Sequence, residues 1–274
     1  MTGTLEHARL TLIGGGVMGE AILRGVLNKG TVAPAQVTVA EPVAARREAL
    51  QQTLGVHCTD DNAQAVQGAD VVVFAVKPQV LGNVLAGLRG RVAAHTLVIS
   101  IVAGAPMALY REAFATEAVV RVIPNTPGQI GQGISLWVTA PGVTELQCDQ
   151  ARELLSALGE EVRGHNENDV DIATAISGSG PAYVFLFIEA LTDAGVQLGL
   201  TRDVASALAL QTVQGSAAYA RAAQEHPAVL RNRVTSPGGT TAAALYELEA
   251  GGMRAMLTRA AVAAYEQARR LGGN

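Results

Sequence analysis

A glycine-rich stretch near the start of the chain limits its possible folds more than any other feature. The pattern G-x-G-x-x-G occupies Gly14–Gly19, after an apolar segment at 9–13 and before a helical pattern at 20–27. In that setting the first glycine permits a tight turn, the second lets a pyrophosphate approach, and the third allows close packing of strand and helix. The stretch therefore predicts the opening of a dinucleotide-binding fold.

Strand and helix patterns alternate from this stretch to about residue 164. Apolar segments that predict strands lie at 9–13, 37–40, 56–58, 70–76, 97–101, 118–123, 134–138 and 161–163. The continuously apolar ones are typical of parallel strands that are buried on both faces. We therefore expect an α/β domain over 1–164, a doubly wound Rossmann-type sheet whose ligands bind at the carboxyl ends of the strands.

From about residue 165 the alternation stops, and we expect an all-helical domain over 165–274. Helical patterns lie at 170–176, 181–198, 201–224, 228–233, 240–249 and 253–271, with a break at Gly178–Gly180. The segment Ala182–Ile188 is apolar on every side, and such a helix must be buried on every side. A dimer interface explains this pattern, and the central helix of a monomeric bundle is the alternative.

Composition excludes several classes of partner and compartment. A formal net charge of −4 argues against nucleic acid or anionic membrane, and no apolar run predicts a membrane span. Cys58 and Cys148 are far apart, show no metal-ligand spacing and suit a reducing compartment. The first residues resemble no signal peptide. We expect a cytoplasmic protein without a metal.

A short turn in the helical half could hold an anion. The residues Ser236–Thr241 read Ser-Pro-Gly-Gly-Thr-Thr and lead into the helical pattern at 240–249. The first N–H groups of a helix lack intrahelical acceptors, and its positive end attracts anions. Gly238 and Gly239 permit close approach, and the hydroxyl groups beside them can donate or accept hydrogen bonds. The alternative is an ordinary helix start.

Few other side chains in the helical half are candidates for catalysis or substrate recognition. It contains no lysine, because the only lysines are Lys29 and Lys77, and its histidines are His165 and His226. His226 precedes Pro227 and fits a helix end better than a site. The Ser-Pro-Gly-Gly turn is therefore the main candidate for substrate recognition.

An acidic residue bears on the choice between NADH and NADPH. Glu41 follows the strand pattern at 37–40 and lies 22 residues after Gly19, about where Rossmann domains place an acid for the adenosine ribose. A carboxylate there repels a 2′-phosphate and favours NADH, whereas Arg46 and Arg47 could compensate. Both cofactors stay open.

Taken together, these segments resemble the pyrroline-5-carboxylate reductase family. The resemblance is carried nearly end to end by 13–19, 74–78, 124–127, 177–183 and 234–249, of which the last is the most specific. It implies NAD(P)H-dependent reduction of the cyclic imine 1-pyrroline-5-carboxylate to L-proline, the last step of proline biosynthesis. It also implies a homodimer with interlocked helical domains, assembled in some members into a decamer.

The resemblance also implies roles for residues in both halves. The substrate carboxylate would bind at Ser236, Gly238, Gly239 and Thr240, and the Thr241 hydroxyl would hydrogen-bond the ring nitrogen as the catalytic group. Glu167 would border the substrate, although a surface loop acid is an equal alternative. The glycine pattern, Glu41 and the resemblance together make these residues the candidates for cofactor binding: Gly14, Gly16, Val17, Met18, Gly19, Glu41, Asn62, Ala75, Val76, Lys77, Pro78 and Ala103.

Two departures from the family pattern concern single residues. Val17 stands where many members carry Asn, which costs a polar contact but leaves the glycine turn intact. Arg233 stands at a variable position, from which it reaches either the substrate carboxylate or solvent.

Three rival functions differ in what they require. A β-hydroxyacid dehydrogenase shares the glycine-rich start but needs a catalytic lysine in the second half, which this chain lacks. A reductase of the six-membered cyclic imine would use the same anion site. A non-catalytic dinucleotide sensor would not need the hydroxyl-rich Ser236–Thr241.

Overall fold

Eight short strands form one sheet in the order β3-β2-β1-β4-β5-β6-β7-β8. Their bounds are β1 Leu10–Ile13, β2 Val37–Ala40, β3 His57–Thr59, β4 Val71–Phe74, β5 Leu97–Ser100, β6 Val119–Ile123, β7 Gly133–Thr139 and β8 Gly159–Arg163. Strands β1 to β6 are parallel, β7 runs antiparallel to β6, and β8 is parallel to β7. The strand predictions and the doubly wound α/β fold class are confirmed.

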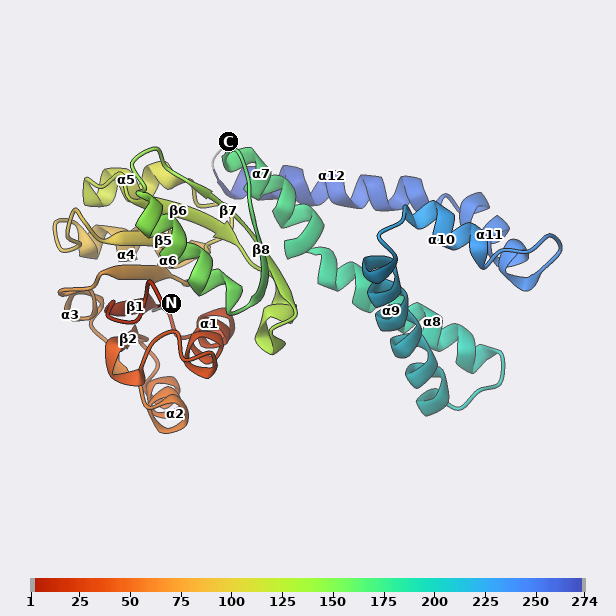
Figure 1. Cartoon of the computed structure of the whole chain (residues 1–274), viewed down its shortest axis with the longest axis horizontal. Coiled ribbons are helices and arrows are strands. Elements are labelled where there is room, and N and C mark those ends of the chain that lie inside the picture. Colours follow the sequence, from red (N-terminus) through yellow and green to blue (C-terminus); the bar gives the residue numbers. More distant parts are fainter. Residues whose placement is uncertain (1–2, 273–274) are drawn as a thin grey trace. The chain divides into compact units, whose positions relative to one another are not determined.

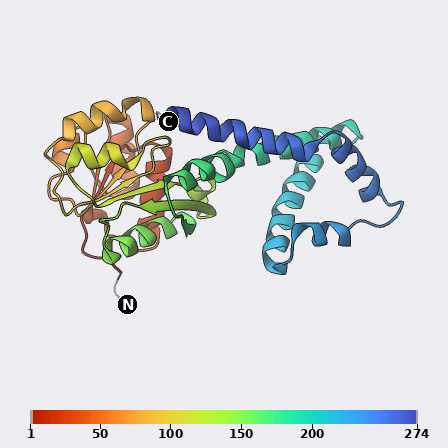
Figure 2. The same cartoon turned by 90° about the horizontal axis from the view of Figure 1, so that it is seen from above.

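Helices cover both faces of this sheet (Figures 1 and 2). Helices α1 (Val17–Asn28), α2 (Ala44–Leu54) and α6 (Glu145–Ser156) pack apolar side chains on one face, together with alternate residues of the strands. Helices α3 (Asn62–Ala65), α4 (Pro78–Leu88) and α5 (Met107–Phe114) cover the other face. Two short 3-10 turns, Pro34–Gln36 and Thr126–Ile130, complete this part of the chain.

The computed structural model describes residues 3–272 and divides into two compact units. The N-terminal unit runs to Ser179 and also includes the end of the chain from Ala264, and the helical unit comprises Gly180–Ala263. The sequence predicted a domain boundary between 164 and 165, where the alternation of strands and helices ends. The two units of the structure are instead defined by which residues contact one another. That boundary stays a prediction.

The remaining helices follow the predicted order. They are α7 Glu167–Ala173, α8 Gly180–Gln197, α9 Arg202–Ala223, α10 Pro227–Arg233, α11 Thr240–Ala250 and α12 Met253–Leu271. The expected break at Gly178–Gly180 takes a different form, because Thr174–Gly178 makes a π-helical turn. The Ser179 N–H donates to the Thr174 carbonyl at 2.7 Å, so the backbone keeps a hydrogen bond of π-helical type at the point where the sequence predicted a break between two helices.

The helical unit has almost no core of its own. Within 180–263 the buried residues are Thr192, Ala205, Ala209 and Leu230. Large apolar side chains of α8 lie open instead, including Phe185 (61% exposed) and Leu186 (66% exposed). The sequence predicted a helix that needs cover on every side, and within one chain that cover is missing.

The helical stretch Glu167–Gln197 is long and apolar enough to cross a membrane by length and composition. This corrects the expectation that no segment passes that test. It is weak evidence for a membrane span, because core helices of soluble proteins pass it as well.

Candidate active site

The glycine loop, Gly14–Gly19, has the geometry that the sequence pattern requires. Gly14 has a φ of +104°, and a Cβ on it would lie 2.7 Å from the Ala75 carbonyl oxygen. A Cβ on Gly19 would lie 2.4 Å from the Gly14 carbonyl oxygen, whereas a Cβ on Gly16 would meet nothing within 4 Å. The loop thus needs glycine at its two packed positions and leaves open space at Gly16, where a ligand can approach.

Helix α1 begins at Val17, earlier than the pattern at 20–27 suggested. Gly16 is its extended N-cap and makes no side-chain cap, so the first N–H groups of the helix point out of the loop without a side-chain partner. Val17, the first residue of α1, is 65% exposed, whereas the next residue, Met18, packs against the hydrophobic core on this face of the sheet. The open helix end can therefore receive an anionic group.

Glu41 and Arg46 hold Gly15 from opposite sides. The Gly15 N–H donates to the Glu41 carboxylate at 2.9 Å, and the Gly15 carbonyl accepts from the Arg46 Nε at 2.7 Å. The second Glu41 oxygen accepts from the Val43 N–H at 3.0 Å. Glu41 is buried, and its contacts are backbone donors rather than a cation. Its carboxylate therefore stays fixed at the end of β2.

Both arginines near this end of β2 are engaged within the protein. Arg46 also forms an ion pair with Glu20 of α1. Arg47 donates to the Glu41 carbonyl at 2.7 Å and lies 3.3 Å from the Asp60 carboxylate. The two cations that could compensate for Glu41 thus have partners within the protein, and the choice between NADH and NADPH stays a prediction. Asn62 begins α3 behind the N-cap Asp61 and is half-buried.

The candidate residues for the nicotinamide half follow two neighbouring strands. Ala75 and Val76 come directly after β4 and are half-buried, and the exposed Lys77 is the N-cap of α4, with Pro78 at its first position. Ala103 follows the adjacent β5 and packs against a small apolar cluster. Because β4 and β5 are parallel neighbours, these residues lie at the same edge of the sheet as the glycine loop.

Glu167 performs a structural task in the N-terminal unit. Its carboxylate accepts from the Met107 N–H at 2.8 Å, which caps the start of α5, and lies 3.2 Å from the Arg121 guanidinium. Arg121 also reaches Asp171. Glu167 thus lies next to the loop that carries Ala103, and its contact with substrate stays a prediction. Sequence reasoning missed Arg121 and Asp171, because no local pattern links residues so far apart.

The Ser-Pro-Gly-Gly turn forms an uncapped helix start in the helical unit. Gly238 has a φ of +69°, with open space around its Cα, and Gly239 is the extended N-cap of α11, without a side-chain cap. A Cβ on Gly239 would lie 2.5 Å from the Ser236 Oγ. Ser236 is exposed and Thr241 is half-buried in the first helical turn. The turn therefore combines free helix N–H groups with the hydroxyl groups of Ser236, Thr240 and Thr241.

Two neighbours of this turn have partners of their own. Arg233 makes two hydrogen bonds to Glu225, at 2.6 and 2.8 Å, and these raise the pKa of its guanidinium above the ordinary value. Arg233 is thus held by Glu225 while its side chain stays half exposed, and its role toward the substrate carboxylate stays a prediction. His226 is the N-cap of α10 and accepts from the Ala228 N–H at 3.2 Å, as expected of a residue at a helix end.

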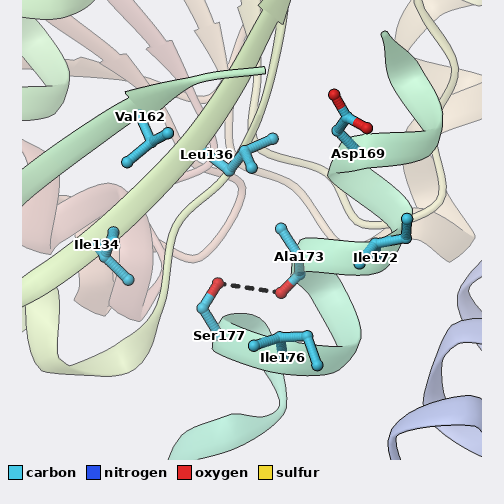
Figure 3. A pocket seen from close by; sticks show the side chains of 8 residues that line it. All are labelled: Ile134, Leu136, Val162, Asp169, Ile172, Ala173, Ile176 and Ser177. Atoms are coloured by element: carbon cyan, nitrogen blue, oxygen red, sulfur yellow. Dashed lines mark hydrogen bonds between the residues drawn. The ribbon is translucent and has the colours of Figure 1, made fainter. Parts of the chain in front are cut away.

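A cavity of about 380 Å³ lies between β7, β8, α7 and the π-helical turn (Figure 3). Its lining is apolar apart from Asp169 and Ser177. The Ser177 hydroxyl donates to the Ala173 carbonyl at 3.0 Å, and Asp169 accepts from the His165 N–H at 2.7 Å. The predicted site residues do not line this cavity, so it is separate from the candidate site.

The chain matches two family models and many known proteins. Residues 167–271 match the family described as pyrroline-5-carboxylate reductase dimerisation, and residues 9–104 match NADP oxidoreductase, coenzyme F420-dependent. A pyrroline-5-carboxylate reductase of Synechocystis is 45% identical, over 96% of this chain and 98% of the relative.

Solved structures of the same family are also similar to this chain. The pyrroline-5-carboxylate reductase of Coxiella burnetii has a TM-score of 0.89 at 36% identity, covering 96% of this chain and 98% of that one. The pyrroline carboxylate reductase of Plasmodium falciparum, solved with NADP bound, has a TM-score of 0.88 at 32% identity, covering 98% and 99%.

Proposed function

This chain belongs to the pyrroline-5-carboxylate reductase family, and from that premise we propose which residues carry the reaction. The protein is an NAD(P)H-dependent oxidoreductase that reduces 1-pyrroline-5-carboxylate to L-proline. The reaction adds a hydride to the C=N carbon and a proton to the ring nitrogen. The observation that carries the proposal is the helix start at Gly239, where free N–H groups and the Thr241 hydroxyl lie within one turn.

The glycine loop holds the pyrophosphate of the cofactor. Open space at Gly16 and the uncapped start of α1 fit an anionic group, because no Cβ and no capping side chain stands in its way. Asn62 borders the adenosine ribose, and Lys77 and Ala103 border the nicotinamide half. When bound, the reduced nicotinamide supplies the hydride.

NADH is the preferred cofactor in this proposal. The Glu41 carboxylate is buried at the end of β2 and is held by two backbone N–H groups. It can accept a further hydrogen bond from a ribose hydroxyl, whereas a 2′-phosphate beside it would be repelled. Arg46 and Arg47 are paired with Glu20 and Asp60, which supports this preference.

The Ser-Pro-Gly-Gly turn binds the substrate carboxylate. The N–H groups at the start of α11 and the positive end of the helix stabilise a carboxylate there, and the Ser236 and Thr240 hydroxyls add donors. Gly238 and Gly239 let the ligand reach the backbone because they present no Cβ. This arrangement orients a small anion by its charged end.

Thr241 acts on the ring nitrogen. A threonine hydroxyl is too weak an acid to protonate an imine unaided, so its role is to orient the nitrogen and pass on a proton, or to hold an iminium already protonated in solution. Its place in the first turn of α11, two residues after Gly239, supports a contact with a substrate whose carboxylate occupies that turn. Holding the imine in line with the hydride donor supplies much of the rate, up to about 7–11 kcal/mol.

The functional unit is a homodimer formed through the helical unit. The exposed apolar residues of α8 and the four buried residues of 180–263 support this proposal, and so does the match to a dimerisation family. Neither nucleic acid nor a membrane is among the proposed partners, in keeping with a net charge of −4. The free thiols Cys58 and Cys148 suit the cytoplasm as its location.

Steady-state kinetics with pyrroline-5-carboxylate test the reaction and the cofactor together. NADH and NADPH are titrated in parallel, with proline formation measured directly. We expect turnover that depends on the imine and a higher kcat/KM with NADH. Absence of turnover with both cofactors would refute the function, and a higher kcat/KM with NADPH would refute the role of Glu41.

A further inference from the structure

Glu20 lies between two arginines at the start of α1. Its carboxylate accepts from the Arg24 Nε at 2.7 Å on one side and pairs with Arg46 of α2 on the other. Burial opposes its ionisation, but the hydrogen bonds from Arg24 and Arg46 outweigh burial and hold the pKa of Glu20 below its ordinary value. Glu20 is therefore charged at neutral pH.

Arg46 belongs to the region where a Rossmann domain meets the adenosine ribose. It is the third residue of α2, four residues after Pro42, and its Nε donates to the Gly15 carbonyl. Its side chain is about one-third exposed. Among the contacts of the described residues, those of Arg46 use the Nε and one terminal nitrogen, which leaves the other terminal nitrogen for a ligand.

We propose that Glu20 is a specificity-determining residue, which directs Arg46 away from the 2′ position of the adenosine ribose and so disfavours NADPH. The inference rests on the proposed placement of the ribose beside Glu41. An arginine paired with a carboxylate carries little net charge and has a fixed direction. Without Glu20, Arg46 keeps only its bond to Gly15 and can turn a full positive charge toward a 2′-phosphate.

The second arginine at this end of β2 does not take over this role. Arg47 is tied to the Glu41 and Pro42 carbonyls, at 2.7 and 2.9 Å, and to Asp60. None of these contacts involves Glu20. Arg46 is therefore the cation that a change at Glu20 releases.

The test compares the affinities of NADH and NADPH in the wild type and four variants. Dissociation constants come from titration of the intrinsic cofactor fluorescence, and KM and kcat from pyrroline-5-carboxylate reduction. The variants are Glu20→Gln, with Glu20→Ala as a second replacement, Arg24→Gln as the matched control, and the double variant Glu20→Gln with Arg46→Gln.

We expect Glu20→Gln to lower the dissociation constant of NADPH relative to that of NADH by about tenfold, which equals about 1.4 kcal/mol. The kcat should stay unchanged. Arg24→Gln keeps the wild-type ratio, and the double variant loses the gain. An unchanged ratio in both Glu20 variants would overturn the proposal. So would an equal gain in Arg24→Gln or a gain that survives in the double variant.

The two proposals fail in different ways in this experiment. If the wild type binds both cofactors but does not reduce the imine, the proposed function fails, while the ratio of dissociation constants still tests Glu20. If the wild type reduces the imine and the ratio does not respond to Glu20, only the present inference fails.

Discussion

The Arg121 guanidinium donates a 2.5 Å hydrogen bond to the Asp171 carboxylate in the interior of the N-terminal unit. Arg121 lies on β6 and Asp171 on α7, and their side chains are 4% and 8% exposed. Arg121 also contacts Glu167, whose carboxylate caps α5. One buried cation therefore connects the sheet, α7 and the start of α5, beside the loop that holds Ala103.

Loss of Asp171 should destabilise the fold strongly. Asp171→Ala leaves the buried Arg121 charge without its main partner, so we expect the free energy of unfolding to fall by about 3 kcal/mol. Asp149→Ala, which breaks an exposed pair with Arg152, is the control and should change it by less than about 1 kcal/mol. Urea unfolding at one protein concentration measures both. Equal losses in the two variants would contradict the prediction.

Gly19→Ala should damage cofactor binding. Its Cβ would lie 2.4 Å from the Gly14 carbonyl oxygen, so the glycine loop must shift. We expect the dissociation constant of NADH to rise at least about tenfold. In Gly87→Ala of α4 the new Cβ meets nothing within 4 Å, so affinity should be kept and stability should rise by about 0.5–1 kcal/mol. Unchanged binding in Gly19→Ala would show that the loop tolerates a side chain.

Thr241→Ala should lower kcat while NADH affinity stays the same. A positioned proton-transfer group contributes about 10²–10⁴-fold, and Thr241→Ser should recover much of that rate. Thr258→Ala removes an exposed hydroxyl of α12 that bonds only the Arg254 carbonyl and should leave kcat unchanged. Wild-type kcat in Thr241→Ala would remove Thr241 from the mechanism.

Phe185→Asp should weaken association. Phe185 is an exposed apolar residue of α8, and a charge there opposes burial in an interface. Light scattering should show the mass falling from that of an oligomer toward the 28.2 kDa chain. Glu112→Lys, at an exposed position of α5, should keep the wild-type mass. A wild-type protein that is monomeric at micromolar concentration would refute the dimer.

Stability should depend on Glu20 in acid. The folded-state pKa of Glu20 lies below its ordinary 4.5, so its stabilising effect is complete above that pH and disappears as pH falls through the folded-state value. In urea unfolding, the free energy of unfolding of the wild type should therefore fall more steeply below pH 4.5 than that of Glu20→Gln. The two free energies should converge in strong acid. Parallel curves would contradict this role.

Much of the N-terminal fold could be predicted because its signals are local. Val71–Phe74 is apolar at every position and every one of its residues is buried in β4. The start of α1 was missed, since glycine-rich sequence reads as a loop although Gly16 already caps the helix. The sequence marked the break near Ser179 but not the π-helical form of Thr174–Gly178 before it, because no residue pattern distinguishes that turn from an α-helical one.

The candidate site was harder to predict where it depends on distant contacts. The glycine pattern gives Gly14 and Gly19 their roles from spacing alone. In contrast, the hydrogen bond from Arg46 of α2 to the Gly15 carbonyl joins a helix to the glycine loop 31 residues away, and no short pattern encodes it. The capping of α5 by Glu167 likewise appears only after the chain has folded.

The sparse burial within the helical unit has a consequence for how this protein reaches its native state. A segment with four buried residues in 180–263 cannot offset the conformational entropy of ordering its helices by itself. In the proposed homodimer, assembly is then the last step of folding, so the melting temperature should rise with protein concentration.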